Sequence, residues 1–274
     1  MLAVDPSLGS WIERTDLGRV ANKKYPPGSV IKPFTILAAY ESGARSDMVI
    51  RCGPSDPNSP VRKECWYRPG HGTVDMEKAI ALSCDRYFLA LAPSIKFSRF
   101  LDVLKRFGLI DAADGTALKA LSDEERIRVM AGLSVRLKIS PTSLLSAYCA
   151  LFNGGYLFED RGAGKMTLTR RIPLEGNALK ILVAGTSGAT RYGTASDIGK
   201  AFPDKEILSK TGTGIYSEGT AADHSRTHAW YVGISPARNP RRAILIFILS
   251  GTGARDAVPA AARFWPEVFR HAPL

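Results

Sequence analysis

The sequence lacks any apolar run long enough to cross a membrane. Its longest such run, residues 243–249, has seven residues, whereas a membrane-spanning helix needs about 18. Internal repeats and extended low-complexity segments are also missing, which excludes solenoids and collagen-like chains. Because 45% of the 274 residues are hydrophobic, we expect the chain as given to be soluble and to bury a sizeable core.

Acidic residues and cysteines are both scarce. The 26 acidic residues stand against 37 basic ones, which gives a net charge of +11. This charge favours polyanionic partners such as nucleic acid, acidic lipid or cell-wall polymer, without choosing among them. The four cysteines are too few for a disulfide scaffold. Three of them share a short stretch with His71 and need a separate explanation.

Apolar periodicity predicts strands at both ends of the chain and helices between them. Alternating patterns predict a hairpin over residues 2–14 and a meander over residues 207–249, with a helix over residues 256–271 behind it. A period near 3.6 predicts further helices over residues 29–40, 74–92, 97–107, 123–130 and 141–152. The two ends are therefore expected to meet in one antiparallel sheet beside a helical lobe, an α+β fold with a cleft between the lobes.

Ser29 and Lys32 form the first candidate catalytic pair. They follow a helix-breaking segment, residues 25–28, and their spacing places both side chains on one face of the first turn of a predicted helix. A desolvated lysine can take the proton of a serine hydroxyl and so create a nucleophile. Taken alone, the pattern is better explained by a helix-capping serine and a surface lysine.

Two further motifs change this interpretation. Residues 210–213, Lys-Thr-Gly-Thr, lie on a predicted strand and offer a cation and hydroxyls for a carboxylate, with a glycine that lets a substrate backbone approach. Residues 83–85, Ser-Cys-Asp, interrupt a predicted helix and offer a second hydroxyl and a carboxylate. In this order, the three motifs match the S-x-x-K, S-D-N and K-T-G set of penicillin-binding proteins and class A β-lactamases.

On these motifs the chain resembles the penicillin-binding protein transpeptidase domain over almost its whole length. Further segments resemble the class B, rod-elongation branch that is similar to penicillin-binding protein 2. They are residues 26–29 with 32–34, 70–72, 83–88, 139–142 before 153–155, 193–195 and 228–233. The resemblance implies one transpeptidase domain, with a five-stranded antiparallel sheet flanked by helices and an inserted all-α lobe. We expect the α/β lobe over about residues 1–50 and 180–274, and the helical lobe over about residues 51–179.

The resemblance also implies a catalytic role for five residues. Ser29 would attack the carbonyl between the two terminal D-alanines of a peptidoglycan stem peptide, with Lys32 as the base. Ser83 and Lys210 would pass the proton to the leaving amine, and Asp85 would orient Lys32 and Ser83. The reaction expected is D,D-transpeptidation, with D,D-carboxypeptidation left open.

Substrate binding is implied for the neighbouring residues. The backbone N–H groups of Ser29 and Thr213 would form the oxyanion hole. Thr211 and Thr213, with Gly212 between them, would bind the terminal carboxylate of the substrate. A β-lactam would acylate the same serine, because its strained amide mimics the D-alanyl-D-alanine carbonyl.

The chain departs from the wider family at the second motif, which ends in Asp85 where asparagine is more common. It also lacks the membrane anchor and the pedestal domain that normally come first, so an upstream anchor remains possible. The resemblance implies an extracytoplasmic location and a glycosyltransferase partner in wall synthesis. It implies no organic cofactor and no nucleic-acid partner.

Cys52, Cys65, His71 and Cys84 form a candidate zinc site. These donors lie within 33 residues at the spacing C-x12-C-x5-H-x12-C, and three thiolates with one imidazole make a closed tetrahedral set. The set resembles the zinc sites of some elongation-type transpeptidases, which have aspartates at the first two positions. A disulfide between Cys52 and Cys65 is the alternative, although it leaves the other two donors unexplained.

Two other functions stay open from the sequence. A serine β-lactamase or a β-lactam sensor of the same fold would share the acylation step and differ in deacylation. A hydrolase needs a base that positions water, and Glu175 is the nearby candidate before Lys210. A basic, zinc-stabilised binding module without catalysis is the second alternative, and it predicts no covalent reaction at Ser29.

Overall fold

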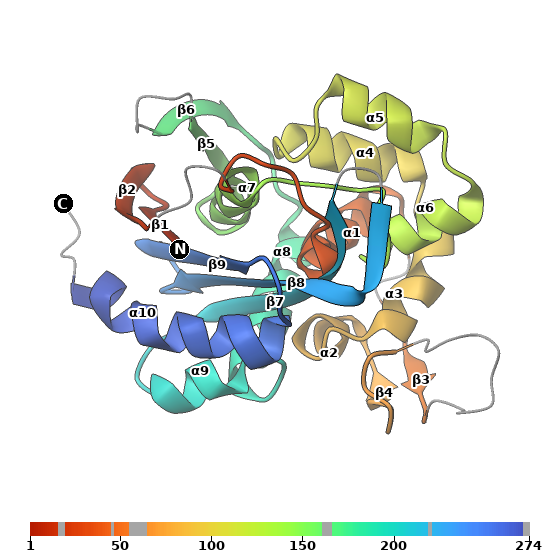
Figure 1. The fold of residues 1–274 in the computed structure, drawn as a ribbon. Helices are drawn as coiled ribbons and strands as arrows, with labels where there is room; N and C mark the ends of the chain where they lie inside the picture. The colour runs from red at the N-terminus through yellow and green to blue at the C-terminus, as the bar shows by residue number, and fades with distance from the viewer. Residues whose placement is uncertain (16–19, 45–46, 55–64, 161–165, 219–220, 271–274) are drawn as a thin grey trace.

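A five-stranded antiparallel sheet forms the centre of the protein (Figure 1). The computed structural model describes residues 1–15, 20–44, 47–54, 65–160, 166–218 and 221–270. The strand order is β2-β1-β9-β8-β7. The strands are β1 (Leu2–Asp5), β2 (Ser10–Arg14), β7 (Leu208–Glu218), β8 (Ala221–Ser235) and β9 (Arg242–Ile248). Because Leu2 of β1 pairs with Leu245 of β9, the predicted meeting of the two ends of the chain in one sheet is confirmed.

Alternating residues of the sheet supply two separate apolar cores. Leu245 and Phe247 face a core shared with the central helices, whereas Ile244 and Ile246 face a smaller core under the last two helices. In Figure 1, α9 (Ser196–Ala201) and α10 (Val258–Arg270) lie along one face of the sheet and α7 (Pro141–Phe152) lies on the other. Both faces are covered, which explains why β9 is an uninterrupted apolar run rather than an alternating one.

The helical elements of the central segment follow the predicted order. The helices here are α1 (Lys32–Glu41), α2 (Met76–Ala81), α3 (Asp85–Leu91), α4 (Phe97–Arg106), α5 (Ala112–Lys119) and α6 (Asp123–Met130). Short turns of other helix types are η1 (Gly28–Ile31), η2 (Ala92–Ser94) and the π-helical η3 (Gly253–Ala257). The predicted helix over residues 74–92 is thus split at residues 82–84, where the second motif interrupts it. Among the described residues, no helix combines the length and apolarity needed to cross a membrane.

The periodicity missed several elements. These are α5, α9, the hairpin of β3 (Ile50–Cys52) and β4 (Gly72–Val74), the hairpin of β5 (Tyr156–Asp160) and β6 (Met166–Arg171), and α8 (Gly176–Arg191). In α8 the glycines that obscure the pattern have a packing role. A Cβ at Gly185 would lie 2.6 Å from the Cβ of Ile80, so the glycine lets α2 and α8 pack closely.

Candidate active site

Ser29 lies in η1, where this short turn crosses β7. Gly28 before it has φ +58°, and a Cβ at Gly28 would lie 2.4 Å from the backbone oxygen of Thr213. A glycine is therefore needed for the serine turn to reach the strand. The helix-capping explanation of Ser29 is wrong, because Pro27 occupies the N-cap position of η1 and no side chain caps this turn.

Two buried side chains anchor the segment around Ser29. The Tyr148 hydroxyl donates a hydrogen bond to the backbone oxygen of Val30 at 2.7 Å. The Trp230 indole N–H donates to the backbone oxygen of Pro26 at 3.0 Å. One anchor comes from α7 and the other from β8, so both layers of the fold fix the backbone on which Ser29 stands.

Lys32 is fully buried at the start of α1. Its ammonium group donates to Asp85 Oδ1 at 2.6 Å and to the backbone oxygen of Ser83 at 3.0 Å. The same nitrogen lies 5.0 Å from the centre of the Phe88 ring. A buried cation requires such partners, and their presence shows that the surface-lysine explanation is wrong.

The second motif forms a tight turn between α2 and α3. Ser83 has φ +53°, a left-handed conformation that costs a residue with a side chain about 1–3 kcal/mol. This conformation directs the Ser83 hydroxyl to Lys210, whose Nζ donates to Ser83 Oγ at 2.9 Å. Asp85 begins α3 with 6% of its surface exposed. The turn thus connects the two buried lysines through one hydroxyl, one carboxylate and one backbone oxygen.

Lys210 is the second fully buried cation and lies on β7. Besides Ser83, it donates to the backbone oxygen of Thr211 at 2.8 Å. Burial, and then the positive charge of Lys32, lower the pKa of Lys210 well below its ordinary value, while Asp85 opposes part of this shift. Lys210 therefore loses its proton more readily than an exposed lysine, which suits a group that relays protons.

The hydroxyls of β7 are held in place by neighbouring segments. Thr211 Oγ1 donates to Thr194 Oγ1 at 2.7 Å, and the backbone N–H of Gly253 donates to Thr213 Oγ1 at 3.0 Å. Since β7 is an edge strand of the sheet, one side of its backbone faces η1 instead of another strand. Residues 211–213 line the cavity at the place that the sequence assigned to substrate.

All three motifs meet at one cavity of about 390 Å³. From the motifs, its lining includes Ser29, Ser83, Asp85, Thr211, Gly212 and Thr213. Sequence reasoning missed the other lining residues, which are Trp66, Leu133, Thr194, Thr252, Ala254 and Arg255. A signal existed for Thr194, which lies in a segment that resembles the family, and for Trp66, which follows the candidate ligand Cys65.

The candidate metal ligands also come together. One ligand atom from each of Cys52, Cys65, His71 and Cys84 lies within 4.8 Å of the others. His71 Nδ1 is 3.6 Å from the Cys52 sulfur and 3.4 Å from the Cys65 sulfur, and the Cys65 and Cys84 sulfurs are 3.9 Å apart. All four cysteines of the chain, Cys149 included, are free thiols.

Three of the six separations are close to those around a tetrahedral zinc ion. With zinc–sulfur bonds of about 2.3 Å and zinc–nitrogen bonds of about 2.0–2.1 Å, tetrahedral ligand atoms lie about 3.5–3.8 Å apart. These three separations are 3.4–3.9 Å, and all six are within 4.8 Å. The hydrogen bond between Cys65 and Cys84 lowers the pKa of the Cys65 thiol and raises the pKa of the Cys84 thiol, so it favours a thiolate at Cys65 and a thiol at Cys84.

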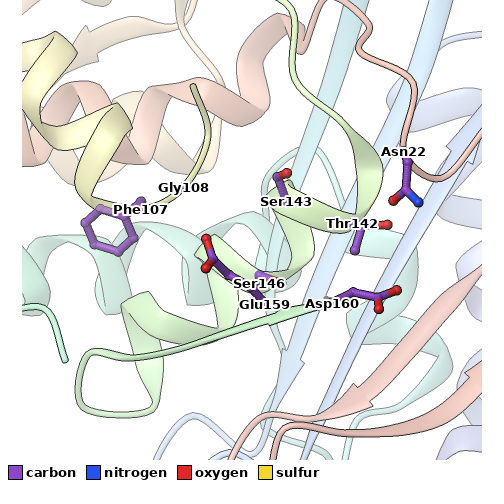
Figure 2. Close-up of a pocket in the computed structure, with 8 residues that line it drawn as sticks. All are labelled: Asn22, Phe107, Gly108, Thr142, Ser143, Ser146, Glu159 and Asp160. Carbon is purple, nitrogen blue, oxygen red and sulfur yellow. The ribbon is translucent and has the colours of Figure 1, made fainter. Parts of the chain in front are cut away.

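A second cavity lies away from the three motifs (Figure 2). Its volume is about 280 Å³, and its lining comprises Asn22, Phe107, Gly108, Thr142, Ser143, Ser146, Glu159 and Asp160. The hydroxyls of Thr142 and Ser143 are already bonded to the backbone oxygen of Ala21 and to Ser140. Among its described lining residues, this second cavity has no serine that is bonded to a lysine. The first cavity is therefore the candidate active site.

Comparison with known proteins agrees with this geometry. The family model of the penicillin binding protein transpeptidase domain matches residues 9–269. A relative in Mycolicibacterium smegmatis, named peptidoglycan D,D-transpeptidase PbpA, is 27% identical over 270 residues, covering 89% of this chain and 55% of the relative. The chain thus spans about half the length of that relative.

Solved structures support the same fold. A chain of a peptidoglycan synthase complex, studied for the coordination of polymerization and crosslinking, aligns with a TM-score of 0.78 and 20% identity, covering 100% of this chain and 56% of the other. Pseudomonas aeruginosa PBP2, crystallised in complex with WCK 5153, aligns with a TM-score of 0.76 and 21% identity, covering 98% of this chain and 70% of the other. Both similarities extend over the sheet and the helical segment together.

Proposed function

Because the chain belongs to the penicillin-binding protein transpeptidase family, we propose that it is a serine-type peptidoglycan D,D-transpeptidase. Its substrate would be a D-alanyl-D-alanine stem peptide. The observation that carries this proposal is the buried network of Lys32, Asp85, Ser83 and Lys210 beside the cavity that Ser29 lines. The name of the Mycolicibacterium smegmatis relative supports the same reaction.

In the proposed acylation step, Lys32 enters as the neutral amine; Ser29 Oγ attacks the carbonyl carbon between the two D-alanines while its proton passes to Lys32, which becomes the ammonium. The carbon–nitrogen bond then breaks, and Lys210 delivers a proton to the departing D-alanine amine through the Ser83 hydroxyl. Asp85 holds the Lys32 ammonium through the 2.6 Å contact. The lowered pKa of Lys210, caused mainly by burial, favours this proton delivery.

The acyl-enzyme would then be attacked by the amine of a second stem peptide, which forms the cross-link, or by water, which gives D,D-carboxypeptidation. The N–H groups of Ser29 and Thr213 would stabilise the oxyanion, a contribution of about 3–4 kcal/mol for each donor. Thr211, Gly212 and Thr213 would receive the substrate carboxylate along the edge of β7. A β-lactam would enter the same cavity and acylate Ser29.

A penicillin labelling experiment tests this function. Incubation should add one β-lactam mass to the tryptic peptide that contains Ser29, and Ser29→Ala should abolish the adduct. A protein that forms no adduct and hydrolyses no drug from about pH 6 to 9 would contradict the proposal and favour the non-catalytic binding module. Rapid drug turnover without an accumulating adduct would favour the β-lactamase alternative.

The position of Glu175 weighs against a β-lactamase. Glu175 is the N-cap residue of α8, and its carboxylate accepts hydrogen bonds from the backbone N–H groups of Asn177 at 3.1 Å and Ala178 at 2.6 Å. A carboxylate that caps a helix in this way has both of its oxygens engaged by backbone donors. Glu175 is therefore poorly suited to activate a water molecule for deacylation.

We further propose that the Cys/His cluster of Cys52, Cys65, His71 and Cys84 holds one structural zinc ion. The tetrahedral spacing and the soft donor set support this. The ion would join the Cys52 strand to the second motif, and it would take no part in acyl transfer. Elemental analysis of protein purified without chelator should give about one zinc per chain, and Cys84→Ser should lower the zinc content. A metal-free protein with Cys52 and Cys65 joined by a disulfide would contradict this.

The cellular setting is also a proposal. An extracytoplasmic location, a glycosyltransferase partner and wall polymer as the anionic surface fit the net charge of +11 and the similarity to a chain of a peptidoglycan synthase complex. Nucleic acid is not an expected partner. Binding of the purified protein to isolated wall sacculi, but not to duplex DNA at the same ionic strength, would test the choice of polyanion.

A further inference from the structure

The Asp85 carboxylate is held by two different segments. Its Oδ1 accepts from Lys32 at 2.6 Å, whereas its Oδ2 accepts from the backbone N–H of Trp66 at 3.2 Å. The first contact belongs to the catalytic motifs and the second comes from a segment outside them. Because each oxygen of this buried carboxylate accepts a hydrogen bond from a different segment, the two contacts together fix the plane of the carboxylate relative to Lys32.

Trp66 also holds the other end of the same turn. Its indole Nε1 donates to the backbone oxygen of Leu82 at 3.1 Å. Trp66 therefore contacts both Leu82 and Asp85. Between these two residues lies Ser83, which has the left-handed backbone. A strained backbone of this kind persists only where surrounding contacts enforce it, and Trp66 supplies one such contact on each side.

The place of Trp66 is set by the Cys/His cluster. Cys65 precedes it, and the Cys65 sulfur lies 3.9 Å from that of Cys84, inside the bridged turn. The indole ring packs 5.5 Å from the His71 ring, centre to centre. Although 52% of Trp66 is exposed, three separate contacts fix it, and an exposed indole is otherwise free to move.

We propose that Trp66 is a positioning residue that brackets the turn from Leu82 to Asp85 and orients the Asp85 carboxylate toward Lys32. This inference rests on the proposed acyl transfer and adds to it a residue outside the three motifs. The contact with Asp85 is made by the Trp66 backbone N–H, which a side-chain substitution keeps. Removing the indole loses the bond to Leu82 and so loosens the segment that presents this N–H, an effect that matters only while the Asp85 carboxylate is present. Ser83 is held in the same way, with its hydroxyl directed to Lys210.

A double-mutant cycle with Asp85 tests the proposal, with the rate of acylation by a fluorescent penicillin as the readout. Trp66→Ala should slow acylation by about tenfold in the wild-type background and by less than about twofold in an Asp85→Ala background. Trp66→Phe, which keeps the ring and loses the bond to Leu82, should give an intermediate rate. Tyr67→Ala is the matched control, because Tyr67 also packs on the His71 ring, 5.1 Å centre to centre, but does not line the cavity. Its rate should stay within about twofold of the wild type.

Metal content gives the second readout. Each Trp66 variant should keep the metal content of the wild type, because Trp66 supplies no ligand atom. Equal losses in both backgrounds would overturn the proposal, since Trp66 would then act through direct contact with the drug. Metal loss in Trp66→Phe would also overturn it, because the residue would then support the cluster rather than Asp85. An unlabelled wild-type protein would contradict the proposed function itself, whereas additivity in a labelled wild type contradicts this inference alone.

Discussion

The two walls of the active-site cavity are built by different means. The strand wall, residues 210–213 of β7, is fixed by backbone pairing to β8, with Lys210 opposite Val232 and Thr213 opposite Ala229. The turn wall, residues 82–85, has no strand partner and contains the left-handed Ser83. Its shape depends on side-chain contacts from Lys32, Lys210 and the indole of Trp66. The strand wall therefore follows from the fold, whereas the turn wall depends on groups that can be removed singly.

Substitutions in the two walls should therefore have different effects. A substitution in the strand wall should remove a functional group and leave the backbone unchanged, because sheet pairing holds it. A substitution around the turn wall should shift several functional groups together. The following predictions test that distinction.

Lys210→Met should have the largest effect, because it removes the strand-wall cation that donates to Ser83. We expect acylation by penicillin to slow by about a thousandfold. The fold should be retained, since a fully buried cation is replaced by an apolar side chain of similar length. Stopped-flow labelling measures the rate, and urea unfolding provides the control. A loss of less than about tenfold would show that acylation does not depend on the Lys210 ammonium group.

Metal removal should affect the turn wall selectively. Chelation should slow acylation by about tenfold and speed amide hydrogen exchange in residues 65–66 and 83–88. Exchange in β7 and β8 should stay unchanged, because their pairing does not involve the Cys/His cluster. Mass spectrometry of peptic peptides measures both regions in one sample. Equal loss of protection in β7 would contradict the proposed independence of the walls.

The pH dependence of stability should separate Lys210 from its Met variant. Because burial lowers the pKa of Lys210 below its ordinary value of 10.5, the unfolded chain binds a proton that the folded chain releases over the interval between these pKa values. The free energy of unfolding of the wild type should therefore rise with pH through that interval. The Lys210→Met variant does not gain in this way, so the difference in its favour shrinks as the pH approaches 10.5. Urea unfolding at several pH values measures the difference in free energy of unfolding between the two proteins. A difference that stays constant with pH would mean that the pKa of Lys210 is not lowered.

The smallest effect should come from the backbone strain of Ser83. Ser83→Gly and Ser83→Ala both remove the hydroxyl, so they differ mainly in their tolerance of φ +53°. The glycine variant should be more stable than the alanine variant by about 1 kcal/mol. Their free energies of unfolding in urea test this. An alanine variant of equal or greater stability would mean that the turn relaxes at no cost.

Much of the strand wall could be predicted from the sequence. Apolar alternation located β7, β8 and β9, and the motif around Lys210 was placed on the correct strand. The predicted family is confirmed. These features are encoded locally, by strand periodicity and by short motifs whose order carries information.

The turn wall could be predicted only in part. The sequence placed Ser83 and Asp85 at a helix break, but it gave no sign of the left-handed backbone, which β-carbon sterics disfavour for serine. Nor did it identify Trp66, because the two bonds that Trp66 makes join segments 16 and 19 residues apart. Helix α8 was missed for a related reason: its glycines reflect contact with α2 rather than a local break.

The pairing of β1 with β9 has a consequence for how the protein is made. Ser29 and Lys210 stand 181 positions apart in the sequence, and the strand carrying Lys210 belongs to a sheet whose β1–β9 pairing joins Leu2 to Leu245. Such distant pairings slow folding, because the entropy cost of closing a long loop comes before the contacts that stabilise the closed loop. A ribosome-bound chain that ends before β7 contains Ser29, the proposed nucleophile, but lacks the strand that completes its cavity. Penicillin labelling of nascent or refolding chains should therefore appear late. The time at which the adduct appears would report when the sheet is completed.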